Sequence, residues 1–262
     1  MFTKAITRAP GANYADGLTT VDLGTPDYQK TLEEHAHYLA ALRQCGLSLI
    51  ELPADSRYPD GTFVEDTAIL LTGSPKGPGG AILTRPGAES RVGEVFSMRE
   101  ILKPFYTELA EICEPGTLDG GDICEAGSHF FIGISLRTNH NGAQQLAEWL
   151  AARGFSSSLV DIRQTAGILH LKSGIAYLGE NRLAIIDSLV AHPAFKGFEL
   201  VHVEAGEEYA ANCIRVNENI LIAAGFPKFE ARLRKLGYNL IVLEMSEFQK
   251  MDGGLSCLSL RF

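Results

Sequence analysis

The sequence lacks any long apolar run and any excess of positive charge. Its apolar segments, such as 68–71, fall far short of the ~18 residues that a membrane-spanning helix needs. Residues 1–10 contain no apolar stretch typical of a signal peptide. The formal net charge of −9 disfavours nucleic acid and an anionic membrane surface as partners, because both bind basic faces. We therefore expect a cytoplasmic protein that binds neither.

The cysteines form no recognisable framework. There are five, an odd number, with no C-x-x-C and no histidine at zinc-ligand spacing. In a cytoplasmic chain this disfavours disulfides and a structural zinc site. Cys257 stands out, because it follows the glycine-rich stretch 252–254 close to the last residue. Two roles remain for it, a small buried apolar side chain or a nucleophile.

Nucleotide-binding signatures are also missing. Neither G-x-G-x-x-G after a first strand nor G-x-x-x-x-G-K-[ST] occurs, so nothing indicates a nucleotide cofactor. The hydrophobic content of 45% and charged content of 21% are ordinary for a globular protein. No change of composition marks a boundary, so we expect one domain over residues 1–262.

A phrase of helix, glycine and strand occurs three times. In 25–53, Thr25 can cap the helix, Pro26 takes its first position and Gly46 ends it. The phrase returns in 141–162 and 227–245, and a weaker helix, broken by a proline, covers about 92–111. Short apolar strands are expected between these units, at 67–71, 81–85, 129–135, 168–173, 175–179, 182–187, 212–217 and 219–225. This order predicts an α/β protein with a coarse repeat of strands plus one helix, rather than a doubly wound sheet.

Two acidic segments could face a cationic ligand. Asp60, Glu65 and Asp66 come just before an apolar strand, although such a stretch alone is more often a solvated turn. Asp119 and Asp122 flank a Gly-Gly pair, which could equally be a hairpin turn. A second acidic Gly-Gly turn precedes Cys257. Because the same pattern occurs twice, two unrelated surface turns explain it less well than a shared functional role.

One histidine and two arginines complete the candidates. His170 lies in an apolar, strand-like run, where a histidine is more often a hydrogen-bonded core residue. With Cys257 and a carboxylate it could instead belong to a thiolate enzyme. Arg85 and Arg137 each end a predicted strand. Both could be surface residues, or together they could clamp a carboxylate.

Seven segments in order resemble one family. They are "FVED", "TRPGAESR", "LDGGD", "SLRTN", "LHLKS", "AANCIRVN" and "DGGLSCLSLRF", and the match runs from about residue 16 to the last residue. The sequence resembles bacterial members of the dimethylarginine dimethylaminohydrolase family, in the guanidine-modifying (pentein) superfamily. The resemblance implies a five-bladed α/β propeller around a central pocket. It also implies a methylated arginine as substrate, no metal or organic cofactor, and an enzyme for which a homodimer is a compatible assembly.

The resemblance also implies roles for individual residues. Cys257 matches the nucleophile, His170 the acid/base and Asp119 the carboxylate of the triad, where some members carry Glu. The remaining matches concern the substrate: Asp66, supported by Glu65, for the guanidinium, Asp60 for the α-amino group, Arg85 and Arg137 for the carboxylate, and Leu18, Phe63 and Met251 for the walls and lid.

The implied chemistry is hydrolysis of the methylated guanidinium to citrulline and a methylamine. A Cys257 thiolate, which we expect in appreciable amount near neutral pH, attacks the central carbon and forms an S-alkylthiouronium. His170 protonates the departing amine and then deprotonates the hydrolytic water.

Several related functions compete with this one. An arginine deiminase usually carries an extra helical insertion and is longer, and an agmatine deiminase would leave Arg85 and Arg137 unexplained. An amidinotransferase would pass the amidino group to another amine. A non-catalytic, ribosome-associated pentein would have lost the Cys, His and carboxylate set, and the acidity of this chain suits it poorly.

Overall fold

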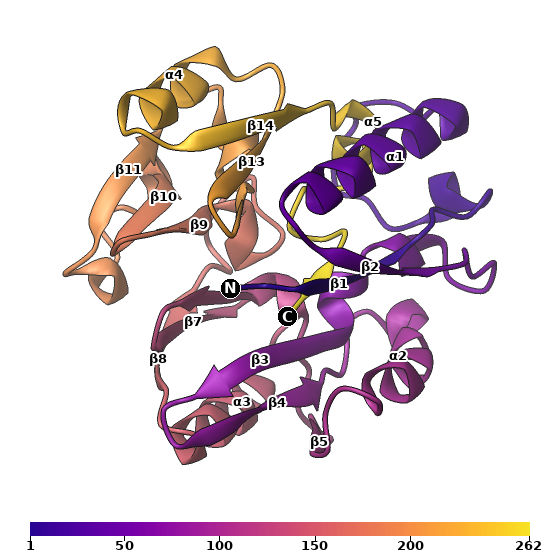
Figure 1. Cartoon of the computed structure of the whole chain (residues 1–262), viewed down its shortest axis with the longest axis vertical. Helices are drawn as coiled ribbons and strands as arrows, with labels where there is room; N and C mark the ends of the chain where they lie inside the picture. Colours follow the sequence, from indigo (N-terminus) through magenta and orange to yellow (C-terminus); the bar gives the residue numbers. More distant parts are fainter.

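Five three-stranded sheets are arranged in a ring, and all five are built alike (Figure 1). The computed structural model describes all 262 residues. In each sheet the central strand pairs antiparallel with one neighbour and parallel with the other. The sheets are β15 (Leu260–Arg261), β1 (Lys4–Arg8) and β2 (Ser48–Leu52); β3 (Ala68–Ser74), β4 (Gly77–Leu83) and β5 (Leu109–Glu111); β6 (Ile123–Ala126), β7 (His129–Ile134) and β8 (Ser156–Asp161); β9 (Ile175–Gly179), β10 (Arg182–Ile186) and β11 (Glu199–Val203); β12 (Ile214–Val216), β13 (Asn219–Ala223) and β14 (Asn239–Leu243).

Helices make the crossovers within four of the sheets, as parallel strands require. They are α1 (Tyr28–Gln44), α2 (Glu94–Leu102), α3 (His140–Ala152) and α4 (Pro227–Lys235), and a short α5 (Ser246–Gln249) follows β14. In the fourth sheet two 3₁₀ turns, Asp187–Leu189 and Pro193–Phe195, replace the helix. This substitution explains why the repeat reads as irregular in the sequence.

The predicted beginning of the first helix was wrong by two residues. Asp27, not Thr25, is the N-cap, and its side chain accepts a hydrogen bond from the backbone N–H of Lys30. Pro26 therefore lies before the helix. The predicted end was right, because Gly46 follows with a φ of +89°, which glycine adopts without strain.

Two other predicted elements were also wrong. Residues 168–173 form no strand; His170 is followed by a 3₁₀ turn, Leu171–Ser173. The helix predicted over about 92–111 ends at Leu102, and β5 occupies the last part of that range. In both places the local apolar content suggested regular structure. The backbone instead forms the turns that the chain needs in order to enter or cross a sheet.

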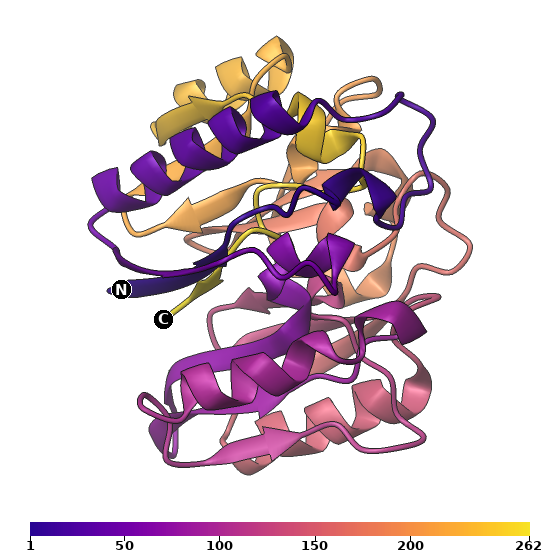
Figure 2. The ribbon, with the colours of Figure 1, turned by 90° about the vertical axis from the view of Figure 1, so that its right-hand side faces the viewer.

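The two ends of the chain complete one sheet. β1 pairs with β15, and the backbone of Lys4 exchanges hydrogen bonds of 2.8 and 2.9 Å with that of Phe262. The termini accordingly lie close together in both ribbon views (Figure 1, Figure 2). The last segment, which carries Cys257, is thereby fixed to the beginning of the chain.

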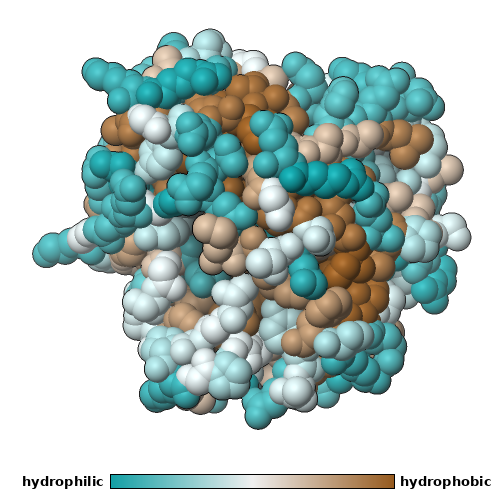
Figure 3. Space-filling view, in the orientation of Figure 1, coloured by the Kyte–Doolittle hydropathy of each residue, from teal (hydrophilic) through white to brown (hydrophobic).

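Apolar side chains fill the space between helices and sheets. The largest cluster joins the third, fourth and fifth sheets and includes the fully buried Phe131, Phe195 and Phe229. On the face of Figure 3, apolar side chains gather beside the outer strands β2 and β14. No helix is long and apolar enough to span a membrane.

In each sheet, the edge strand that pairs antiparallel with the central strand lies at the ring axis. These strands, β3, β6, β9, β12 and β15, all contribute residues to the wall of one axial cavity. Each is preceded by a turn, and consecutive turns contact one another: Val64–Thr67, Gly120–Asp122, Leu171–Ser173 and Glu208–Ala211, with the turn around Cys257 as the fifth. The fold therefore brings five segments that are distant in sequence to one end of the axis.

Candidate active site

Each of the five turns supplies a polar side chain beside the start of its strand. These side chains are Asp66, Asp119, His170, Asn212 and Cys257. Four of them were predicted from the sequence. Asn212 was missed, although it lies in a segment that carried the resemblance, and its position before β12 matches that of the others before their strands.

His170 and Asp119 form a buried pair. His170 Nε2 lies 3.0 Å from Asp119 Oδ2, and the other oxygen of Asp119 accepts a hydrogen bond from the backbone N–H of Gly87 at 2.8 Å. Burial lowers the pKa of His170, but Asp66, the hydrogen bond to Asp119 and the charge of Asp122 together raise it to about 9. The imidazole is therefore protonated near neutral pH and can act as an acid.

Asp66 is held between a backbone amide and an arginine. Its Oδ1 accepts a hydrogen bond from Gly121 N at 2.8 Å, and its Oδ2 lies 2.6 Å from Arg91 Nη1. Burial raises the pKa of Asp66, yet His170, Arg91 and the amide of Gly121 overcome it and lower the pKa. Asp66 is therefore a fixed carboxylate in the pocket.

Arg91 was missed by the sequence analysis. Its guanidinium is almost fully buried and also pairs with Glu94 at 2.8 Å. The signal was an Arg and a Glu three residues apart at the start of a helix, with Arg91 as the last residue of the segment already noted for Arg85. Only the fold shows that Arg91, and not Arg85, contacts Asp66.

The Gly-Gly turn between Asp119 and Asp122 is explained by close packing. A Cβ atom at Gly121 would lie 2.8 Å from the ring of His170 and 3.1 Å from Asp66 Oδ1. Any side chain there would separate the acid from the imidazole. Asp122 takes a structural position, accepting hydrogen bonds from Ser135 Oγ at 2.6 Å and Leu171 N at 2.9 Å.

Cys257 is positioned by its neighbours in the ring. Its carbonyl accepts a hydrogen bond from Glu65 N at 3.1 Å, and the preceding Ser256 N donates to Asn212 Oδ1 at 2.9 Å. Burial, with the charges of Glu65 and Asp66, raises the pKa of the Cys257 thiol to about 12. This environment therefore opposes the thiolate fraction expected near neutral pH. Burial and the charges of Glu65 and Asp66 raise this pKa by more than the charge of Lys172 lowers it.

One small pocket joins most of the predicted site residues. Its volume is about 30 Å³. The lining includes Leu18, Asp60, Phe63, Asp66, Arg91, Arg137, Leu169, His170, Met251, Asp252, Gly253 and Cys257. Asp119 stands behind His170.

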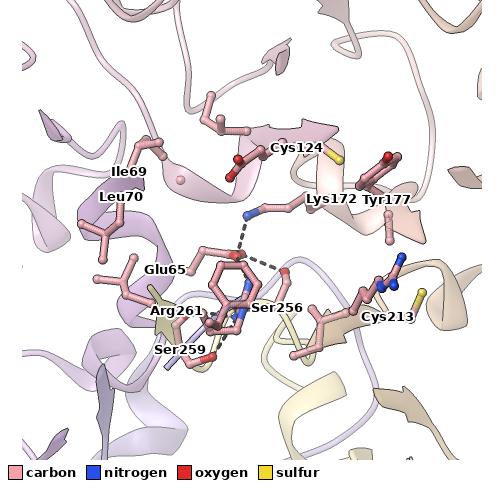
Figure 4. Close-up of a pocket in the computed structure, with 18 of the residues that line it drawn as sticks. Glu65, Ile69, Leu70, Cys124, Lys172, Tyr177, Cys213, Ser256, Ser259 and Arg261 are labelled. Carbon is pink, nitrogen blue, oxygen red and sulfur yellow. Dashed lines mark hydrogen bonds and ion pairs between the residues drawn. The ribbon is translucent and has the colours of Figure 1, made fainter. Parts of the chain in front are cut away.

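Two predicted substrate residues do not line this pocket. Arg85 pairs with Glu114 at 2.6 Å and donates to the carbonyl of Gly116. Glu65 points to the axial cavity instead, where it accepts a hydrogen bond from Lys172 at 2.5 Å (Figure 4). Glu65 therefore does not line the pocket, and it acts on the site through its charge and through its backbone hydrogen bond to Cys257.

A loop closes one side of the pocket. Leu18 N donates to Asp60 Oδ1 at 3.0 Å, which ties the loop to the predicted α-amino acceptor. Thr20 donates from both its backbone N and its hydroxyl to Asp252 Oδ2, at 2.5 and 2.9 Å. Asp252, with a φ of +56°, connects the loop to the segment that bears Cys257.

Carboxylate and imidazole ligand atoms also meet at a spacing that could hold a metal ion. One atom each of Asp66, Asp119 and His170 lies within 4.8 Å of the others. Asp66 is already compensated by Arg91, and His170 by Asp119. The prediction that no cofactor is needed remains a prediction.

A ring of five such units is the pentein fold, so the predicted fold class is confirmed. The N-terminal domain of a cyanobacterial arginine dihydrolase has the same fold, with a TM-score of 0.84 over 100% of this chain and 97% of that one, at only 16% identity. No family model matches the chain.

Closer relatives narrow the family. The dimethylarginine dimethylaminohydrolase of Pseudomonas aeruginosa is 44% identical over 263 residues, covering both chains completely, and that of Streptomyces coelicolor is 32% identical over 98% of this chain and 96% of its own. A crystal structure of a mutant of the Pseudomonas enzyme, complexed with citrulline, superposes over both whole chains with a TM-score of 0.94 and 43% identity. The chain belongs to the dimethylarginine dimethylaminohydrolase family.

Proposed function

We propose that this protein hydrolyses Nω-methylated arginines to citrulline and the corresponding methylamine, with Cys257 as nucleophile and His170 as acid/base. The observation that carries the proposal is one pocket holding Cys257, the protonated His170 and the ionised Asp66. A guanidinium is planar and cationic, so a fixed carboxylate beside a thiol orients its central carbon toward sulfur.

The proposal also assigns partners to the substrate's amino-acid end. Asp60 and Arg137 line the same pocket, and we assign them as the acceptor for the α-ammonium and the donor to the α-carboxylate. Burial raises the pKa of Asp60, while the charges of Arg91 and Arg137 and the backbone N–H of Leu18 oppose this shift, and an arriving ammonium would further stabilise the carboxylate form. Arg85 reaches the substrate only if it leaves Glu114.

The thiol becomes reactive through the substrate itself. Asp66 and Glu65 raise the pKa of Cys257, and a bound guanidinium compensates Asp66 and lowers that pKa again. The thiolate then attacks the guanidinium carbon, and its lost proton leaves to solvent.

His170 carries the remaining proton transfers. The imidazolium donates its proton to the methylated nitrogen, the C–N bond breaks, and the neutral amine departs from the S-alkylthiouronium. The neutral imidazole then takes a proton from water, whose oxygen attacks the same carbon. The C–S bond breaks, which releases citrulline and returns Cys257 to its starting form. Asp119 orients the ring throughout.

The remaining expectations belong to the same proposal. These residues carry the steps without a cofactor, within a single domain. Five free cysteines support a reducing, cytoplasmic setting. Self-association as a homodimer stays a prediction.

The decisive test measures citrulline formed from asymmetric dimethylarginine, monomethylarginine and arginine in parallel. We expect turnover of the two methylated substrates and its loss in Cys257→Ser. Turnover of arginine alone would keep the site but assign a deiminase activity. No citrulline from any of them, from a folded protein, would contradict the proposal and favour the non-catalytic function.

A labelling experiment checks the nucleophile separately. We expect 2-chloroacetamidine, a cationic amidine, to alkylate Cys257 ahead of Cys113, although Cys113 is the more exposed thiol. Cys113 is the internal control, since it does not line the pocket that holds Cys257, His170 and Asp66. Preferential labelling of Cys113 would count against Cys257.

A further inference from the structure

A buried carboxylate and a buried hydroxyl lie behind the catalytic pocket, and neither touches the substrate in the proposed chemistry. They belong to Asp122 and Ser135, which are 0% and 7% exposed and do not line the pocket. Ser135 Oγ donates a hydrogen bond of 2.6 Å to Asp122 Oδ2. A carboxylate is costly to bury unless its oxygens accept hydrogen bonds, so the partners of this pair show what it holds in place.

Ser135 fixes the backbone that carries Arg137. Its hydroxyl oxygen accepts hydrogen bonds from Arg137 N at 2.9 Å and Thr138 N at 3.0 Å, and Ser135 N donates to the carbonyl of Thr138 at 3.0 Å. These bonds close a tight turn directly after β7. Leu136 in this turn is 84% exposed, so its side chain does not anchor the turn. The place of Arg137 in the pocket therefore rests on hydrogen bonds to one hydroxyl.

Asp122 fixes the backbone beside His170. Its Oδ1 accepts a hydrogen bond of 2.9 Å from Leu171 N, the amide that follows His170 in the sequence. Gly133 makes this approach possible, because a Cβ atom there would lie 2.9 Å from both Asp122 Oδ1 and Leu171 Cβ. The two oxygens of Asp122 thus accept from two different segments, the turn of Ser135 and the residue next to the proposed acid/base.

The same turn also contacts the partner of His170. Thr138, which has no exposed surface, accepts a hydrogen bond of 3.1 Å on its Oγ1 from Asp119 N. Gly87 N donates to Asp119 Oδ1, and a Cβ atom at Gly87 would lie only 2.2 Å from the carbonyl oxygen of Arg137. The turn therefore lies between the proposed carboxylate-binding arginine and the acid/base pair, and it is bonded to both.

We propose that Ser135 is a positioning residue of the active site. Its single hydroxyl places Arg137 for the substrate carboxylate and, through Asp122, keeps His170 at the guanidinium. This inference rests on the proposed function and deepens it. The hydroxyl accepts from two amides and gives its own proton to Asp122, so all its capacity is used. Its removal leaves two amides of the turn unpaired and takes one donor from a buried carboxylate.

A pair of substrates separates positioning from folding. Nω-methylagmatine is monomethylarginine without its carboxylate, so the ratio of the two kcat/KM values measures recognition by Arg137. The ratio does not depend on the fraction of folded protein, because both substrates use the same sites. We expect Ser135→Ala and Arg137→Ala each to lower the preference for monomethylarginine about tenfold. Ser135→Thr, which keeps the hydroxyl, should restore most of the preference.

A double variant shows whether the hydroxyl acts through the arginine. If it does, Ser135→Ala combined with Arg137→Ala lowers the preference no further than Arg137→Ala alone. Ser74→Ala is the matched control. Ser74 Oγ also accepts from the amide two residues later, Lys76 N at 3.3 Å, but between β3 and β4 and outside the pocket. This variant should leave the preference and kcat unchanged.

The kcat for Nω-methylagmatine tests the connection to His170. It is compared at the maximum of each variant's pH profile, so that a changed pKa of His170 does not contribute. We expect Asp122→Asn to lower it about tenfold and Ser135→Ala about threefold, because the ring is then less well oriented. Arg137→Ala should leave it within about twofold, since this substrate has no carboxylate.

The outcomes distinguish this inference from the proposed function. Turnover by the wild type with an unchanged preference in Ser135→Ala, additive losses in the double variant, or an unchanged kcat in both Asp122→Asn and Ser135→Ala would overturn the inference alone. If the wild type acts on arginine instead, arginine and agmatine form the substrate pair and the same results are expected. No turnover of any of these substrates would overturn the proposed function and this inference together.

Discussion

His170 Nε2 lies 3.0 Å from Asp119 Oδ2, and no other carboxylate makes so short a contact with the ring. Asp119 has no exposed surface, so this hydrogen bond is shielded from water. The pair fixes the ring and, with Asp66 and Asp122, keeps it protonated, as the proposed donation of a proton to the leaving amine requires.

Removing the charge of Asp119 should therefore lower both the pKa of His170 and the turnover. We expect Asp119→Asn to reduce kcat by roughly 10²–10⁴-fold, as for other residues that orient a catalytic histidine. The imidazole titration, followed by NMR, should move below its wild-type value of about 9. Asp119→Glu, which keeps the charge, is the matched control and should recover most of the pKa. An unchanged titration in Asp119→Asn would contradict this role.

The same histidine should make stability depend on pH. The native pKa of His170, about 9, lies above the ~6.5 of an unfolded histidine, so the native state binds this proton more tightly. This contribution is complete below about pH 6.5 and is lost as the pH rises toward 9; its size is on the order of 3 kcal/mol. Urea unfolding at pH 6 and pH 9 measures it. His170→Gln should remove this part of the difference, and an identical slope in both proteins would show that it is absent.

Glu94 should act on substrate binding through Arg91. In Glu94→Gln, Asp66 becomes the only carboxylate in direct ion-pair contact with Arg91, and so it holds the substrate guanidinium less well. We expect KM to rise about tenfold with a smaller change in kcat. Breaking this buried pair should also cost about 3 kcal/mol of unfolding free energy. Steady-state kinetics and denaturant unfolding measure the two effects.

Glu100 provides the control for that experiment. It pairs with Lys103 at 2.6 Å, also three residues apart, but on the exposed side of the helix. Glu100→Gln should change stability by less than about 1 kcal/mol and leave KM alone. Equal effects of the two substitutions would mean that burial beside Asp66 is irrelevant.

The loop over the pocket should depend on Asp252. Asp252→Asn keeps a residue that tolerates positive φ but weakens both bonds from Thr20. We expect KM to rise roughly fivefold, in line with about 1 kcal/mol for such bonds, and proteolysis near residue 20 to accelerate. Asp22→Asn, in the same loop and without these bonds, should leave both unchanged. Unchanged or slower proteolysis of the Asp252 variant would contradict this role of Asp252 in holding the loop.

The sequence identified the site residues whose type and local setting are unusual. Cys257, His170 and Asp119 combine rare chemistry with Gly-Gly turns or an unusual apolar setting, and the resemblance assigned their roles. Arg91 could not be chosen over Arg85 in this way. Both are arginines in one short segment, and only the packing of α2 against the turn around Asp66 separates them.

Other features depend on the ring as a whole. Asn212 looks like an ordinary strand-end residue until its turn meets that of Cys257. The fourth sheet hides its place in the repeat because 3₁₀ turns replace its helix. The reactivity of Cys257 also depends on surroundings, since the acids that raise the pKa of its thiol come from another sheet.

The pairing of β1 with β15 makes the activity of this protein depend on closure of the ring. Cys257 lies three residues before the strand that completes the first sheet, while its acid, imidazole and amide partners come from four other sheets. A chain opened between β1 and β15 could keep four intact sheets and most of its core, yet would lose the position of Cys257, the proposed nucleophile. Turnover therefore measures whether the ring is closed. When the pairing of β1 with β15 is lost, turnover should disappear before circular dichroism or a measurement of compactness detects a change in the fold.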